Sequence, residues 1–226
     1  MMKLSALALA TGLAFTSSAF AAQAVWDTAA PWGDISNTSQ YAEWGSFYDP
    51  ASEDTGIFLT DSNPDIGLSS GTSASISESS QSAFVTSGGN IYSFSLPMAF
   101  TATLSGTTGG LFDVYLRIAT LGTISSTSAL LNGVSATSTI QFSRSAGTMM
   151  GGASTEQEVY WLWKDVAGAD LYTFNFNATS SSMSLDQLAL ATVAVAAVPE
   201  PSTYGMLALG LGVLAYAGRR TRKNQA

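Results

Sequence analysis

The side chains of this 226-residue chain that could perform chemistry are mainly carboxylates, because it contains neither histidine nor cysteine. The usual general base of a serine triad, the commonest zinc ligand and the thiolate nucleophile are therefore absent. Two carboxylic acids held at a suitable separation can still hydrolyse a glycosidic bond. The candidates are Glu156, Glu158, Asp165 and Asp170, and no pattern in the sequence singles out two of them.

A second group of oxygen ligands alternates along the chain as Asp61, Asn63 and Asp65. Alternating oxygens in a loop suit calcium, so these three residues are a candidate cation site. An EF-hand loop has glycine at its sixth position and glutamate at its twelfth, where this chain has Ile66 and Thr72. The pattern favours an acidic turn whose side chains accept hydrogen bonds from nearby backbone amides. A calcium loop of another kind is the alternative.

Tryptophans are the third candidate group, because exposed rings can stack on sugars. Trp161 and Trp163 share one face of a predicted strand, where they fill a core or form a stacking platform. An N-terminal cluster lies in loop-like sequence, where large rings either cap the fold or meet a ligand. Its members are Trp26, Trp32, Trp44 and Tyr48. The candidate stacking residues are therefore Trp32, Trp44, Trp161 and Trp163.

The elements that must position these residues are predicted to be strands. From about residue 83 apolar residues alternate with polar ones, which is typical of half-buried strands. The clearest cases are residues 92–104, 112–118, 140–142, 159–164, 172–177 and 185–195. Pro97 lacks an N–H group and so marks an edge strand or a break. Glycine-rich turns between these strands predict an all-β antiparallel β-sandwich of jelly-roll type over residues 83–197.

Residues 22–82 are acidic, aromatic and irregular, and we expect this segment to pack on the sandwich. One short strand is predicted at residues 56–60, and the serine-rich stretch 69–82 suits a solvated loop. Asp113 and Arg117 fall on the same face of a predicted strand, and Lys164 adjoins Asp165. These charges are expected to form surface ion pairs, which contribute little to stability.

The N-terminus predicts a secretory signal peptide over residues 1–21. A short positive start, Met1-Met2-Lys3, precedes a mostly apolar stretch over residues 4–15. Ala19-Phe20-Ala21 provides a small-x-small cleavage site, and Ala22-Gln23-Ala24 is a competing one. The apolar stretch is too short for a permanent membrane span, so we expect it to be removed on export.

The C-terminus has three parts in a fixed order. The motif at residues 198–202 contains Pro199, Glu200 and Pro201, and an apolar run over residues 203–218 follows it. At a rise of about 1.5 Å per residue this run suits a short transmembrane helix. The tail, residues 219–226, carries a basic cluster that stays cytoplasmic by the positive-inside rule. That cluster is Arg219, Arg220, Arg222 and Lys223.

This arrangement resembles the PEP-CTERM protein-sorting tag of Gram-negative bacteria that make exopolysaccharide. The resemblance implies an exported protein that the inner membrane holds transiently, until an exosortase, a membrane-embedded protease, cuts near the motif. It further implies a destination at the cell surface or in the extracellular matrix and contact with exopolysaccharide. Apart from the calcium alternative given above, the residues indicate no cofactor. It covers the C-terminal tag alone and identifies no ligand for the preceding domain.

The net charge of the exported part limits the classes of molecule that it can bind. Residues 22–198 carry fifteen acidic and three basic side chains, a formal net charge of −12. Nucleic acid is excluded as a partner, because phosphate binding needs a basic footprint. Neutral polysaccharide is compatible with this charge. We therefore expect a non-catalytic, exopolysaccharide-associated surface or matrix protein; the alternatives are a carbohydrate-binding module with an exposed aromatic site and a glycan-active hydrolase.

Overall fold

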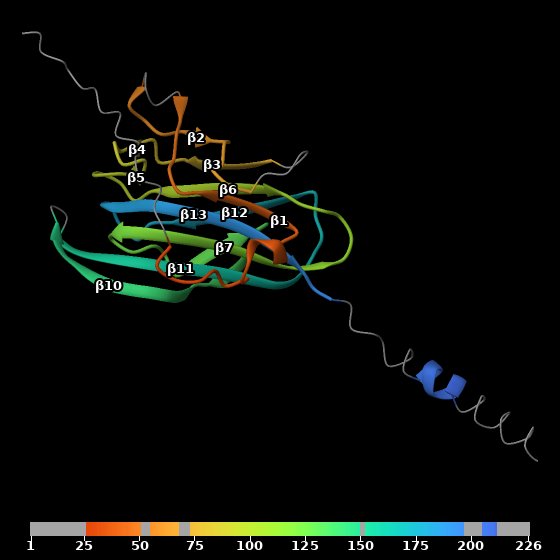
Figure 1. The fold of residues 1–226 in the computed structure, drawn as a ribbon. Helices are drawn as coiled ribbons and strands as arrows, with labels where there is room; N and C mark the ends of the chain where they lie inside the picture. The colour runs from red at the N-terminus through yellow and green to blue at the C-terminus, as the bar shows by residue number, and fades with distance from the viewer. Residues whose placement is uncertain (1–25, 51–54, 68–72, 150–151, 197–204, 212–226) are drawn as a thin grey trace, which may run out of the picture.

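The computed structural model describes residues 26–50, 55–67, 73–149, 152–196 and 205–211, and within them two antiparallel sheets pack face to face (Figure 1). In sheet A the strands follow the order β10 (Thr139–Met149), β11 (Gly152–Ala167), β7 (Leu111–Gly122), β13 (Met183–Ala194), β5 (Ile91–Tyr92) and β4 (Phe84–Val85). A seventh strand of this sheet, β1 (Gln40–Trp44), also pairs with β13. Sheet B has the order β2 (Thr60–Asp61), β3 (Ala74–Glu78), β6 (Ala99–Ser105), β12 (Leu171–Asn177), β8 (Ser128–Leu131), β9 (Val134–Thr137). A single 3-10 turn, η1 (Ile35–Asn37), precedes β1.

The core lies between the sheets and follows from the period-two pattern. In β12, Tyr172, Phe174 and Phe176 are buried, while the residues between them are half-buried. Phe176 stacks on Phe100 of β6 with ring centroids 4.9 Å apart, and Trp161 approaches Phe176 from sheet A. Burial of each such side chain contributes roughly 1.5–3 kcal/mol, so a chain without disulfides holds together by packing.

The predicted all-β fold with two antiparallel sheets is confirmed, whereas the jelly-roll type stays a prediction. The predicted boundary at residue 83 is wrong, because β1, β2 and β3 belong to the two sheets. The serine-rich stretch is also more than a loop: Ala74, Ile76 and Glu78 of β3 are buried in alternation. Serine is small enough to fill the remaining strand positions, so composition alone concealed this strand.

A glycine-rich turn and the break at Pro97 both occur as the sequence predicts. Asn132-Gly133 joins β8 to β9, with φ of 48° and 86°, the left-handed conformation that a tight hairpin requires. Pro97 separates β5 from β6, which lie in different sheets.

Just before Pro97, the alternate residues that face the core are the opposite set from the predicted one. Tyr92, Phe94 and Leu96 were expected to face the core, but Phe94 is 64% exposed and Ser93 is fully buried. After the proline, Met98 and Phe100 face the core as expected. The chain crosses from sheet A to sheet B at this point, and the crossing reverses which alternate positions point inward.

The termini lie largely outside the described residues. The predicted signal peptide, the sorting motif with Pro199, Glu200 and Pro201, and the basic tail all fall there. Residues 205–211, inside the predicted transmembrane run, are helical. Within the described part of the chain, no helix is long and apolar enough to cross a bilayer.

Candidate functional site

The face of sheet A that points away from sheet B, called here the outer face, is divided into a covered part and an open part. Residues 26–39, called the N-terminal strap, lie over the covered part (Figure 1). Trp32 of the strap contacts Tyr41 of β1 and Tyr115 of β7 edge-on, at centroid distances of 5.7 and 5.6 Å. Ala189 and Ala191 of β13 complete this second, smaller core. The small alanine side chains leave the space that the indole occupies.

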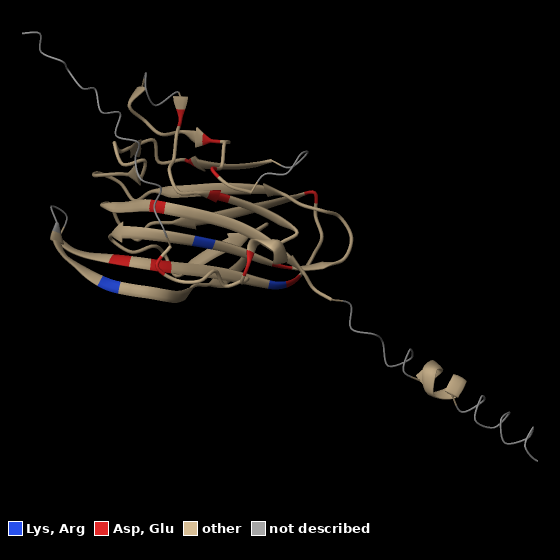
Figure 2. Cartoon of the chain, viewed as in Figure 1, with Lys and Arg blue, Asp and Glu red and all other residues tan. Residues whose placement is uncertain are grey.

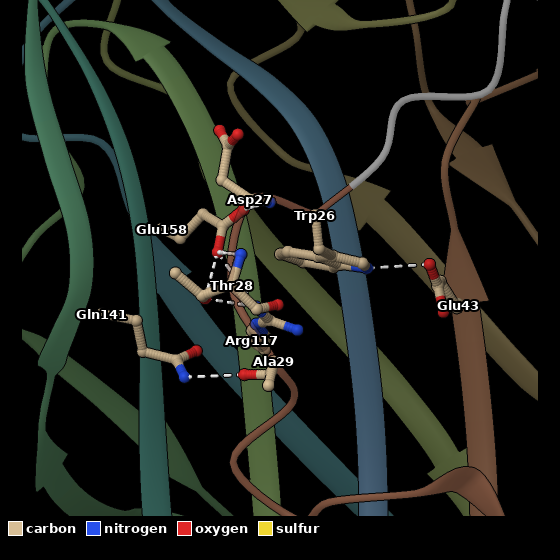
Figure 3. Close-up of polar contacts among 8 residues, drawn as sticks. All are labelled: Trp26, Asp27, Thr28, Ala29, Glu43, Arg117, Gln141 and Glu158. Atoms are coloured by element: carbon tan, nitrogen blue, oxygen red, sulfur yellow. Dashed lines mark hydrogen bonds and ion pairs between the residues drawn. The ribbon is translucent and has the colours of Figure 1, made fainter.

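An ion pair is buried beneath the strap. Arg117 of β7 donates to the Glu158 carboxylate of β11 at 2.9 Å, and their side chains are only 2% and 3% exposed. The same guanidinium nitrogen donates to the carbonyl and hydroxyl oxygens of Thr28. The backbone amides of Asp27 and Thr28 donate to Glu158, as does the Thr28 hydroxyl (Figure 3). Since these donors satisfy a desolvated carboxylate, the pair fastens the strap to the sheet.

Trp26 extends this cluster toward β1. Its indole lies 4.0 Å from the Arg117 guanidinium carbon, and its N–H donates to Glu43 at 2.8 Å (Figure 3). The Tyr41 hydroxyl also donates to Glu43. Burial, with the hydrogen bond to Glu43, raises the pKa of Tyr41 far above its usual value, so this phenol stays protonated. Burial also lowers the pKa of Arg117, although Glu158 opposes this effect.

The predicted surface ion pair between Asp113 and Arg117 is therefore wrong. Arg117 is buried with Glu158, and the Asp113 carboxylate accepts a hydrogen bond from the Asp165 amide at 3.1 Å. The pairing of β7 with β11 places Arg117 opposite Tyr160, two residues along the same face from Glu158. That register brings together charges 41 residues apart in the chain.

The four candidate catalytic carboxylates do not form one cluster. Glu158 is held in the buried pair, and Glu156 forms an exposed ion pair with Arg144 at 2.6 Å. Asp165 lies at the register shift near the other end of β11, and Asp170 lies in the turn before β12. Nine residues of extended chain separate Glu156 from Asp165, or roughly 30 Å.

The four candidate stacking tryptophans are buried, which corrects the prediction of a platform built from them. Trp44, Trp161 and Trp163 lie in the core between the sheets, and Trp32 is enclosed between the strap and sheet A. The indole N–H groups of Trp161 and Trp163 donate to the carbonyls of Thr127 and Val134, at 3.0 and 2.8 Å. A ring enclosed in this way presents no face to a sugar.

In the candidate calcium loop the acidic side chains accept hydrogen bonds from backbone amides. The Asp61 carboxylate accepts from the amides of Tyr48 and Asn63, both at 2.8 Å. Asp65 accepts from the amides of Gly45 and Ser46. Among the described residues no cluster of three metal-binding side chains is present. Asp61 and Asp65 thus connect two loops, as an acidic turn would.

The open part of the outer face holds three aromatic rings that the sequence did not single out as a site. Phe84, Tyr92 and Phe94, called the ring cluster, lie within 4.7–6.0 Å of one another. A cavity of about 190 Å³ adjoins them, with Tyr92, Leu121, Gly122, Ser154, Ser182 and Ser184 among its lining residues. Pro97, which marks a break in this run, was the signal in the sequence that the residues before it need not face the core.

Two acidic residues, Glu156 of β11 and Asp186 of β13, lie near each other on this open part, and Figure 2 shows acidic positions on both strands. Asp186 of β13 accepts hydrogen bonds from Asn90 at 2.8 Å and Ser184 at 2.6 Å. Burial raises the pKa of Asp186 to about 6, and the charge of Glu156 adds to the effect. Near neutral pH the site therefore combines ring faces, hydroxyls and carboxylates, and no basic residue lines the cavity among the described ones.

Comparisons with known proteins bear on the C-terminus. Residues 197–223 match the family description "PEP-CTERM protein-sorting motif". No curated protein and no solved structure matches the chain. The match covers the three parts identified in the sequence: the proline-flanked glutamate, the apolar run and most of the basic tail. The chain therefore carries a PEP-CTERM sorting motif, which indicates export and transient membrane anchoring until an exosortase processes it.

Proposed function

We propose that the mature protein is a non-catalytic β-sandwich of jelly-roll type that associates with exopolysaccharide at the cell surface or in the extracellular matrix of a Gram-negative bacterium. The PEP-CTERM motif at residues 197–223 carries this proposal, because it directs the chain out of the cell through the exosortase system. Removal of an N-terminal signal peptide is part of the same proposal.

The arrangement of the carboxylates supports a non-catalytic role. A glycosidase needs one protonated and one ionised acid facing each other across a bound sugar. Glu158 has its oxygens occupied by Arg117 and the strap, and Glu156 pairs with Arg144. Two of the four candidate carboxylates are therefore engaged in ion pairs within the fold.

The charge of the exported part supports a neutral polysaccharide as the partner. Its net charge of −12 disfavours uronic acid polymers and other polyanions, since like charges repel at close range. Hydroxyl-rich neutral chains pay no such penalty. Their hydroxyl groups can also form hydrogen bonds with the serine and threonine side chains that are frequent in these strands.

Fractionation of the producing bacterium tests this function. We expect the protein in the extracted polysaccharide fraction, and its release when that polysaccharide is depolymerised enzymatically. Recovery in polysaccharide-free fractions alone would contradict the proposal. Incubation of the purified polysaccharide with the protein should leave its chain length unchanged; shortened chains would favour the hydrolase alternative.

A carbohydrate-binding module is the second candidate function, and one observation favours it. The ring cluster contains a phenyl ring that is 64% exposed, beside a cavity lined with serines. Exposed aromatic rings and a few convergent polar groups are the usual components of a binding site. This candidate differs from passive association by predicting saturable binding at one place.

A further inference from the structure

The register of sheet A places a line of outer-face residues across its strands at the open end. Successive cross-strand pairs connect one residue on each of β4, β5, β13, β7, β11 and β10. In order these residues are Phe84, Tyr92, Ser184, Leu121, Glu156 and Arg144. With strands about 4.8 Å apart, the line is roughly 24 Å long. It begins with aromatic rings, passes the cavity and ends at a charged pair.

Shape and exposure make this line accessible at its aromatic end. Phe94 is 64% exposed and packs edge-on against Tyr92, with centroids 4.7 Å apart. Tyr92 also lines the cavity, so one ring connects the exposed cluster to the hollow beside it. Gly122 has φ of +103°, and a Cβ atom there would lie 2.1 Å from the Ser182 carbonyl oxygen. Glycine at this position therefore lets the Ser182 backbone pass close to β7 at the cavity wall.

A buried hydroxyl without a partner points to a ligand. Ser154 lines the cavity, is 2% exposed, and its Oγ makes no hydrogen bond in the structure. Such a group is rare in proteins, because leaving it unsatisfied is unfavourable. Across the cavity lies Ser184, which is held by Asp186 and Asn90. A hydroxyl of a bound molecule would satisfy Ser154 and find acceptors opposite.

We propose that this line is a binding site for a neutral polysaccharide segment that lies across the strands of sheet A. The ring cluster packs against the C–H face of one sugar, and Ser154 and Ser184 hydrogen-bond hydroxyls of a sugar in the cavity. Glu156 and Asp186 accept from sugar hydroxyls and repel acidic polymers. This site rests on the proposed function and locates it on the molecule.

Isothermal titration of the full chain, purified in detergent, tests the site. The probes are the exopolysaccharide of the producing bacterium, a neutral glucose hexasaccharide and polygalacturonate. We expect saturable binding of the exopolysaccharide, weaker binding of the hexasaccharide, and none of polygalacturonate. Phe94→Ala should weaken binding about tenfold, the loss expected for one aromatic contact. Tyr48→Ala, which removes a ring that is 55% exposed and lies outside the line, is the matched control and should bind like the wild type.

Ser154→Ala separates a binding role from a structural one. Because the hydroxyl has no protein partner, its removal should leave the melting temperature unchanged or higher, while binding weakens at least fivefold. Unchanged binding in both Phe94→Ala and Ser154→Ala would refute this site while leaving exopolysaccharide association intact. Failure of the wild type to bind the exopolysaccharide would refute the site and the proposed function together. Preferential binding of polygalacturonate would overturn the assignment of a neutral ligand.

Discussion

Replacing Glu158 by glutamine tests whether the buried ion pair holds the N-terminal strap on sheet A. The substitution keeps the shape of the side chain but removes its charge. Arg117 then stays buried without a counterion, and the amides of Asp27 and Thr28 lose a charged acceptor. Leaving one partner of a buried pair unpaired costs about 3–5 kcal/mol.

The expected loss can be followed by thermal unfolding of the full chain in detergent. For a domain of this size each kcal/mol shifts the melting temperature by about 2–4 °C, so Glu158→Gln should melt roughly 6–20 °C lower. Glu156→Gln is the matched control, two residues away on the same strand. Its partner Arg144 is 63% exposed, and loss of such a pair costs about 1 kcal/mol or less.

A double variant checks the physical cause. Arg117→Met with Glu158→Leu removes both charges and should recover much of the stability, because apolar replacements of a buried pair are often neutral. Equal melting temperatures for Glu158→Gln and Glu156→Gln would refute the reasoning. The strap would then be held by Trp32 and its packing, and the ion pair would contribute nothing measurable.

Three further predictions follow from the described contacts and from the tag. Because the pKa of Asp186 is raised to about 6 in the folded state, the free energy of unfolding should fall by up to about 3 kcal/mol as pH rises from about 4 to 7. Urea unfolding of Asp186→Asn should lack this dependence on pH. Identical pH profiles for the variant and the wild type would contradict the prediction. Asp61→Ala should lower the free energy of unfolding by about 1–3 kcal/mol, because two backbone amides lose their acceptor. Added calcium should not raise the melting temperature of the variant or of the wild type. A calcium-dependent rise in the wild type would argue against the acidic turn. Replacing Pro199, Glu200 and Pro201 by alanine should leave the uncut chain in the membrane fraction on immunoblots, whereas normal processing would exclude the motif as the recognition element.

Much of the strand pattern followed from the sequence because alternation is a local property. The runs around Phe112, Tyr172 and Val159 became β7, β12 and β11, and Pro97 marked the break between β5 and β6. Strands β1 and β3 were missed, and the strand predicted at residues 56–60 overlaps β2 only at Thr60. In β1 four successive residues are buried, so no alternation marks it, and in β3 serine fills the alternate positions.

The candidate site was harder to predict, because each candidate depended on contacts far apart in the chain. Trp161 and Trp163 were assigned correctly to a single face, but only the packing of sheet B over that face buries them. Arg117 looked like a surface residue until Thr28, 89 residues earlier, covered it. Phe94 looked like a core residue, and the crossing between sheets exposed it.

Export with transient membrane anchoring, and the all-β class of the fold, could be read from the sequence alone. The sorting tag is a linear pattern that a membrane protease reads without a folded context, and period two is a property of the extended backbone. Three features depend on the folded molecule: which alternate face is covered, which acids form ion pairs, and that Phe84, Tyr92, Ser184 and Glu156 share one line. The reason is physical: strand order and register set these neighbours, and they arise from pairing between segments that no local pattern connects.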